Sequence, residues 1–156
     1  MNEGYLESML DFLGDIGLSH SAATLSGTRL PGLRIANGEL RIDSDKLTWP
    51  GDILYMAGLI AVMPPSRRTG LSCDEKPDAG HELPAMAWAY AASVHLGIDP
   101  TVVFHEGGYQ GGGGEMACRF QGPRAIGVPM LVWLGLCDAG GFPTMNSWIL
   151  KSEAPS

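Results

Sequence analysis

The stretch TWPGDILYMAGLIAVMPP, residues 48–65, limits the possible folds more than any other part of the chain. Pro50 stands where a helix tolerates a missing N–H, Asp52 suits the positive first turn, and a Pro-Pro pair stops the far end. Almost every residue between these signals is apolar, and a helix that is apolar on all sides is buried. We therefore expect a central core helix over residues 50–63, too short for a bilayer, which needs roughly 20 residues.

Two further segments have helical patterns. Residues 1–18 place apolar side chains at helical spacing opposite an acidic face, and Gly17 ends the pattern. Residues 83–96 are rich in alanine, with Pro84 in the expected first turn. Small side chains let helices approach closely, so we expect this Ala-rich helix to pack against the central helix near Gly58.

Residues 32–43 predict a β-hairpin. The dipeptide Asn37-Gly38 supplies the two positive φ angles of a type I′ turn. The turn sets the register, which pairs Ala36 with Glu39, Ile35 with Leu40 and Arg34 with Arg41. Two arginines opposite each other repel, so we expect a carboxylate nearby, from Asp43 or Asp45.

The remaining segments are less regular. We expect surface loops over residues 19–31 and 66–80, an extended segment over 101–104 and a third apolar helix over 130–137. Aromatic and aliphatic residues before position 151 are available to pack, and residues 151–156 are expected to be disordered. Together the patterns predict an α+β fold: a single, mainly helical small domain over residues 1–156 with a hairpin or small sheet.

Composition excludes several classes of partner. The chain has 156 residues, 45% of them hydrophobic, and a net charge of −7 without a basic cluster. Nucleic acid and anionic membranes are therefore not expected partners, whereas a small molecule, a protein or a second copy of the chain remains open. The acidic N-terminus lacks the pattern of a signal peptide, and the three cysteines show no paired spacing, so we expect a cytoplasmic protein with reduced thiols.

Residues 52–62, DILYMAGLIAV, resemble the active-site helix of zincin-type metallopeptidase-like domains, in which HEAGH or a similar H-E-x-x-H string precedes an apolar run. There two His side chains at i and i+4 bind zinc and the Glu is the general base. Aligned on the shared Ala-Gly pair, Tyr55 and Leu59 stand at the His positions and Met56 at the Glu position. The resemblance thus implies a zincin-like helix in the core that has lost its metal, and no cofactor is expected.

Glu82 begins the Ala-rich helix, where the resemblance to gluzincin-type domains places a third metal ligand. With Tyr55 and Leu59 in place of imidazoles, a lone carboxylate would not hold zinc. The alternative is that Glu82 stabilises the positive N-terminus of its helix.

The string His105-Glu106-Gly107-Gly108-Tyr109 is a second near match to H-E-x-x-H, with Tyr109 in place of the second His. Its glycines oppose a helix and lead into a glycine-rich loop. Functional residues are frequent in such loops, and His105 with Glu106 suits acid–base chemistry near neutral pH.

These observations favour a non-catalytic domain that acts as a binding or regulatory module. Its cleft would lie between the central helix and the 105–109 segment, lined by Tyr55, Met56, Leu59, Glu82, His105 and Tyr109. Two alternatives stay open. One is a metal-free enzyme that uses His105 and Glu106 with Tyr55, and the other is an immunity or antitoxin-like partner of another protein, suggested by small size and acidic charge.

Overall fold

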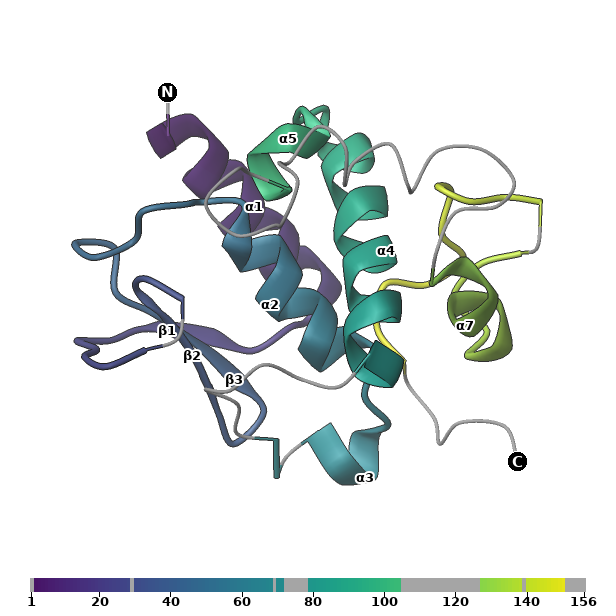
Figure 1. The fold of residues 1–156 in the computed structure, drawn as a ribbon, viewed down its shortest axis with the longest axis horizontal. Helices are drawn as coiled ribbons and strands as arrows, with labels where there is room; N and C mark the ends of the chain where they lie inside the picture. The colour runs from purple at the N-terminus through teal and green to yellow at the C-terminus, as the bar shows by residue number, and fades with distance from the viewer. Residues whose placement is uncertain are drawn as a thin grey trace.

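A small sheet and a group of helices make up the fold (Figure 1). The computed structural model describes residues 2–28, 30–68, 70–71, 79–104, 127–138 and 140–150. The described helices are α1 (Asn2–Ile16), α2 (Asp52–Ala61), α3 (Pro65–Arg68), α4 (Ala79–Leu96), α5 (Pro100–Val103) and α7 (Val128–Trp133). The described strands are β1 (His20–Ala22), β2 (Leu33–Ala36) and β3 (Glu39–Ile42). The expected α+β class, mainly helical with a small sheet, is confirmed.

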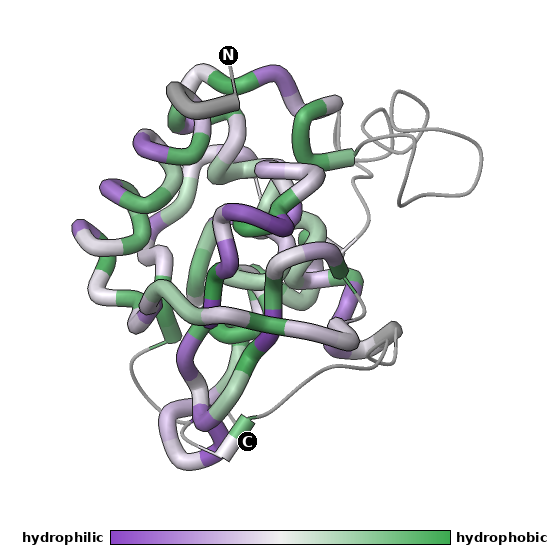
Figure 2. Tube along the Cα trace, turned by 90° about the vertical axis from the view of Figure 1, so that its left-hand side faces the viewer, coloured by the Kyte–Doolittle hydropathy of each residue, from purple (hydrophilic) through white to green (hydrophobic). Residues whose placement is uncertain are grey.

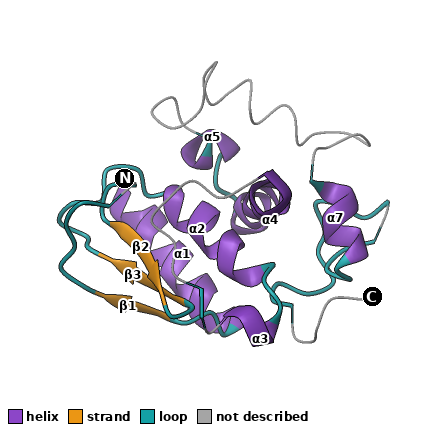
Figure 3. Cartoon of the chain, turned by 60° about the horizontal axis from the view of Figure 1, so that its bottom comes forward, coloured by secondary structure: helices purple, strands orange, loops and turns teal. Residues whose placement is uncertain are grey.

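The elements form layers around α2, as Figure 3 shows. The sheet lies on one side of α2 and α4 on the other, and α7 packs against α4. All ten residues of α2 are buried, as the expected core helix requires. Figure 2 shows hydrophilic and hydrophobic residues alternating around α1, the amphipathic helix that begins at the N-terminus.

The hairpin has the predicted turn and register. Asn37 and Gly38 have φ angles of 53° and 76°, so both residues of the turn are in the left-handed region. The strands β2 and β3 pair Leu33 with Ile42, Arg34 with Arg41, Ile35 with Leu40 and Ala36 with Glu39. Leu33, Ile35, Leu40 and Ile42 are buried beneath the helices.

Replacing Gly38 by Val is expected to lower the free energy of unfolding by about 1 kcal/mol or more, because a β-branched residue resists a positive φ. Gly38→Asn is the matched control, since Asn tolerates the left-handed region, and it should cost less. Urea unfolding of the two variants measures the difference. Equal stability of the Val and Asn variants would contradict the strained turn.

Glu39 supplies a carboxylate for Arg41, one of the two facing arginines. Its Oε1 lies 2.7 Å from Nε of Arg41 on the same strand. The hydroxyls of Ser21 and Ser19 also donate to Glu39, at 2.9 and 3.0 Å, and these bonds, together with Arg41, lower the pKa of its carboxyl. The carboxylate therefore links β3 to the β1 side of the sheet.

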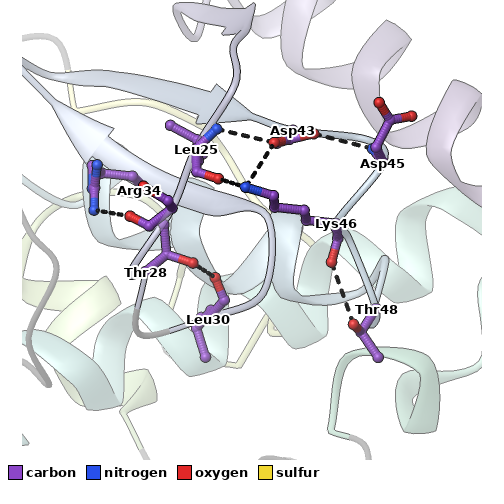
Figure 4. Close-up of polar contacts among 9 residues, drawn as sticks. Leu25, Thr28, Leu30, Arg34, Asp43, Asp45, Lys46 and Thr48 are labelled. Atoms are coloured by element: carbon purple, nitrogen blue, oxygen red, sulfur yellow. Dashed lines mark hydrogen bonds and ion pairs between the residues drawn. The ribbon is translucent and has the colours of Figure 1, made fainter.

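The prediction of Asp43 or Asp45 for this role was wrong, because Asp43 is engaged elsewhere (Figure 4). The buried Asp43 accepts from the backbone N–H of Leu25 at 2.9 Å and of Asp45 at 3.2 Å, and Lys46 Nζ lies 3.9 Å away. Lys46 Nζ also donates to the Leu25 carbonyl. This cluster fixes the loop before the hairpin to the loop after it. Arg34 donates to a backbone carbonyl of the first loop.

Strand β1 lies in a segment predicted as a loop, residues 19–31. His20–Ala22 pairs in parallel with β3, which places β3 in the centre of the order β1-β3-β2. Three small or polar residues carry no alternating apolar pattern. The pairing is explained by the free edge of β3 and by the hydrogen bonds to Glu39. Both lie far from β1 in the sequence.

One predicted extended segment is a helix, and two predicted helices have different boundaries. Residues 101–104 were predicted to be extended, but α5 occupies Pro100–Val103, because Asp99 caps it by accepting from the Thr101 N–H at 2.9 Å. Helix α4 begins at Ala79, four residues before the predicted start, so Pro84 lies inside the helix and not in its first turn. The third apolar helix, predicted over 130–137, is α7 at Val128–Trp133.

Helix α3 and the start of α4 also occupy parts of the predicted loop 66–80. Proline near a helix start removes one hydrogen bond, and an 18-residue helix held by buried side chains tolerates that loss.

The C-terminal segment packs as expected. The centroid of the Trp148 ring lies 5.0 Å from that of Phe12 and 5.6 Å from that of Trp88, and both pairs are edge to face. Trp88 Nε1 also donates to the Trp148 carbonyl at 2.7 Å. The Leu150 N–H donates to the Ala61 carbonyl of α2. The predicted disorder of 151–156 concerns residues outside the described part of the chain. Within that part, no helix combines the length and apolar character needed to span a membrane.

Candidate functional site

Helices α2 and α4 approach each other closely at Gly58, as predicted. A Cβ atom on Gly58 would lie 2.5 Å from the carbonyl oxygen of Ala85 and 3.2 Å from its Cα. Only a residue without a side chain fits that spacing. The close approach places side chains of α2 directly against the first turns of α4.

Tyr55 and Glu82 meet across this interface. The Tyr55 hydroxyl donates to Glu82 Oε2 at 2.8 Å, between residues 27 positions apart in sequence. Tyr55 is only 4% exposed, and a buried hydroxyl needs such a partner. The pair can hold or pass a proton, and it also serves to join the two helices. Glu82 does lie in the first turn of α4, where a carboxylate is favoured.

Met56 and Leu59, the other two positions of the motif, are buried in the core. The backbone carbonyl of Leu59 has a partner from α4, since His81 Nε2 lies 2.7 Å from it. A carbonyl can only accept, so Nε2 carries the hydrogen. His81 therefore satisfies one of the carbonyls that the end of α2 leaves open.

Arg68 satisfies further carbonyls at the same helix end. Its Nε donates to Ile60 at 3.3 Å and an Nη to Met63 at 2.9 Å, and the same Nη also donates to Leu150. Burial lowers the pKa of this guanidinium, although arginine stays charged at neutral pH. With the Leu150 N–H on Ala61, the C-terminal segment and α3 are both tied to the end of α2.

Two pockets in the described part of the chain lie outside the motif positions. The larger, about 380 Å³, is lined by residues that follow α2, by α3, by the start of α4 and by α7. The smaller, about 190 Å³, lies near the hairpin turn and the end of α2. Neither is lined by Tyr55, Met56 or Leu59.

Of the predicted site residues, Tyr55 and Glu82 are thus brought into contact, and Met56 and Leu59 are buried beside them. His105, Glu106 and Tyr109 lie outside the described residues. The cleft that they were expected to complete, and their acid–base role, stay predictions.

Metal and thiol chemistry have little support in the described part of the chain. There, no three His, Cys, Asp or Glu residues are grouped so that they could hold a metal ion. Cys137 is buried, and its burial, with the charge of Asp138, raises the pKa of its thiol, which disfavours the nucleophilic thiolate.

No known protein-family model, curated protein or solved structure matches the chain. The site therefore has to be interpreted from its own chemistry.

Sequence reasoning missed His81 and Arg68. The contact of His81 with the Leu59 carbonyl depends on how α4 packs against α2, so no local pattern indicates it. Arg68 carried a usable signal, because basic side chains just beyond a helix end commonly bond its last carbonyls.

Proposed function

We propose that the chain is a non-catalytic, zincin-like domain without its metal site that acts as a binding or regulatory module. The observation that carries the proposal is the contact between Tyr55 and Glu82. The resemblance assigns Tyr55 to the first His position and Glu82 to the third-ligand position, on different helices. The 2.8 Å hydrogen bond between them is the proximity that such an assignment requires.

The residues at these positions do not fit zinc. Protein zinc sites use imidazole, thiolate and carboxylate ligands, and a catalytic site also keeps an open position for water. Of Tyr55, Leu59 and Glu82, only Glu82 belongs to that ligand set, and Tyr55 already occupies one of its oxygens. The general-base position holds the buried thioether of Met56. No reaction step through a metal follows from these side chains.

What the residues do instead is hold two helices in a fixed relation. The hydrogen bond, the apolar contacts of Met56 and Leu59, and the close approach at Gly58 rigidify the α2–α4 pair. A rigid helix pair suits a binding module, because surfaces carried on fixed elements bind with less loss of entropy.

Restoring the motif tests this proposal. The variant with Tyr55→His, Met56→Glu and Leu59→His should bind a stoichiometric amount of zinc with Glu82 as third ligand, while the natural chain binds none. The zinc content of each protein is measured after dialysis, and its zinc affinity is measured by calorimetric titration. Adding Glu82→Gln to the triple variant is the matched control, which should weaken zinc binding at least tenfold.

Three polar side chains in a core can prevent folding, so the double variant with Tyr55→His and Leu59→His is made in parallel. Circular dichroism with and without zinc shows whether each variant folds, since binding energy contributes to folding. A folded variant that binds no more zinc than the natural chain would contradict the zincin-like scaffold. Stoichiometric zinc in the natural chain would contradict a lost metal site.

A further inference from the structure

The larger pocket has features of a ligand site. Its volume of about 380 Å³ lies within the range of small-molecule sites, and α3, α4, α7 and the residues that directly follow α2 all contribute to it. Its wall combines apolar side chains with two basic ones, Arg67 and His81. Pockets of this kind bind an apolar body and orient it through a few polar groups.

The apolar side of the pocket includes exposed large side chains. Trp133 is 55% exposed and Met130 is 38% exposed, and both lie on α7 at the pocket wall, with Met63 also lining the pocket. An indole face and flexible thioethers suit a flat aromatic ring, since methionine adapts its shape and its sulfur contacts aromatic rings favourably. A bound ring would cover apolar surface that otherwise faces water.

The polar side is set by Arg67. Its side chain is exposed and forms no hydrogen bond or ion pair with another residue of the described ranges, in contrast to the neighbouring Arg68. A guanidinium presents paired donors that match both oxygens of a carboxylate. The His81 ring, which also lines the pocket, is oriented by its bond to Leu59, so it is a defined part of the wall.

We propose that this pocket binds a small aromatic carboxylate, with the carboxylate on Arg67 and the ring against Trp133 and Met130. The inference rests on the proposed binding role and names its ligand class. It does not depend on the zincin-like resemblance, because none of the pocket residues belongs to the metal-ligand positions.

The probe is naphthalene-2-carboxylate, titrated into the full natural chain by calorimetry, with the neutral naphthalene-2-carboxamide as isostere. The carboxylate should bind, and the carboxamide should bind about tenfold more weakly, because it lacks the charge that the guanidinium pairs with. Amide shifts in a ¹H–¹⁵N spectrum should cluster in the residues that follow α2, in α3, at the start of α4 and in α7.

Single substitutions separate the two sides of the pocket. Arg67→Ala should weaken binding of the carboxylate about tenfold and leave the affinity for the carboxamide unchanged. Trp133→Ala should weaken binding of both probes. Arg34→Ala and Trp49→Ala are matched controls, since neither residue lines this pocket, and both should bind like the natural chain.

No binding at millimolar probe, shifts located elsewhere, or equal carboxylate affinity in Arg67→Ala would each overturn the inference. Both pocket variants change exposed side chains, so they are expected to fold, and thermal unfolding checks this. Zinc binding by the restored motif is a separate readout. If the restored motif bound no zinc, the zincin-like scaffold would be contradicted but the pocket proposal would stand. If the probe did not bind, the pocket proposal would be contradicted but the zincin-like scaffold would stand.

Discussion

Gly58→Ala is expected to lower the free energy of unfolding by about 1–3 kcal/mol, although alanine normally favours a helix over glycine by about 1 kcal/mol. The added Cβ would lie 2.5 Å from the carbonyl oxygen of Ala85. That atom belongs to the backbone of α4, so no side-chain rotation relieves the contact. The helices have to move apart, and the packing around them is disturbed.

Gly14→Ala is the matched control, since Gly14 lies inside α1 and a Cβ there would meet nothing within 4 Å beyond the adjacent residues and the nearby backbone of its own helix. It is expected to raise the free energy of unfolding by about 0.5–1 kcal/mol. Urea unfolding of both variants measures the two effects. The slope of the free energy of unfolding against urea concentration should stay unchanged. If Gly58→Ala also proved stabilising, the close approach of α2 and α4 would be wrong.

The same contact gives a structural reason for the glycine of the Ala-Gly pair, and this reason does not depend on the resemblance to zincins. Ala57 and Gly58 are both buried, and Gly58 permits the approach that brings Tyr55 to Glu82. The geometry of the candidate site thus depends on a glycine that takes no part in its chemistry. Spectra that report the environment of Tyr55 should therefore change in Gly58→Ala.

Local patterns allowed much of the fold to be predicted from the sequence. The Asn37-Gly38 turn determines strand register because its two positive φ angles fit one hairpin geometry. The apolar run over α2 predicted complete burial, since its sequence offers no polar face. In both cases the decisive information lies within a few neighbouring residues.

Where structure depends on distant partners, local patterns were insufficient. Strand β1 forms because β3 has a free edge, and α5 forms because Asp99 caps a valine pair that otherwise favours strands. In the site, the proximity of Tyr55 to Glu82 was expected only through the family resemblance. The pocket at Arg67 and Trp133 combines three helices and has no continuous sequence pattern.

Arg68→Ala is expected to lower the free energy of unfolding by about 2–3 kcal/mol, near the upper end of the contribution of hydrogen bonds that involve a charged group. The guanidinium bonds Ile60 and Met63 at the end of α2 and Leu150 in the C-terminal segment. All three carbonyls lose this donor, and only the Ile60 carbonyl keeps a backbone donor in the described residues, the Met63 N–H at 3.1 Å. The last described residues should also detach from α2 more readily.

Arg67→Ala is the control for Arg68→Ala, because it removes the same charge from the adjacent position without breaking a bond to any described residue. It should change stability by less than about 0.5 kcal/mol. Chemical unfolding measures both, and hydrogen exchange at the Leu150 amide, which donates to Ala61, reports the docking of the C-terminal segment. Faster exchange in Arg68→Ala alone is expected. Equal stability and exchange in the two variants would mean that Arg68 does not hold the segment, and that the aromatic contacts of Trp148 with Phe12 and Trp88 are sufficient.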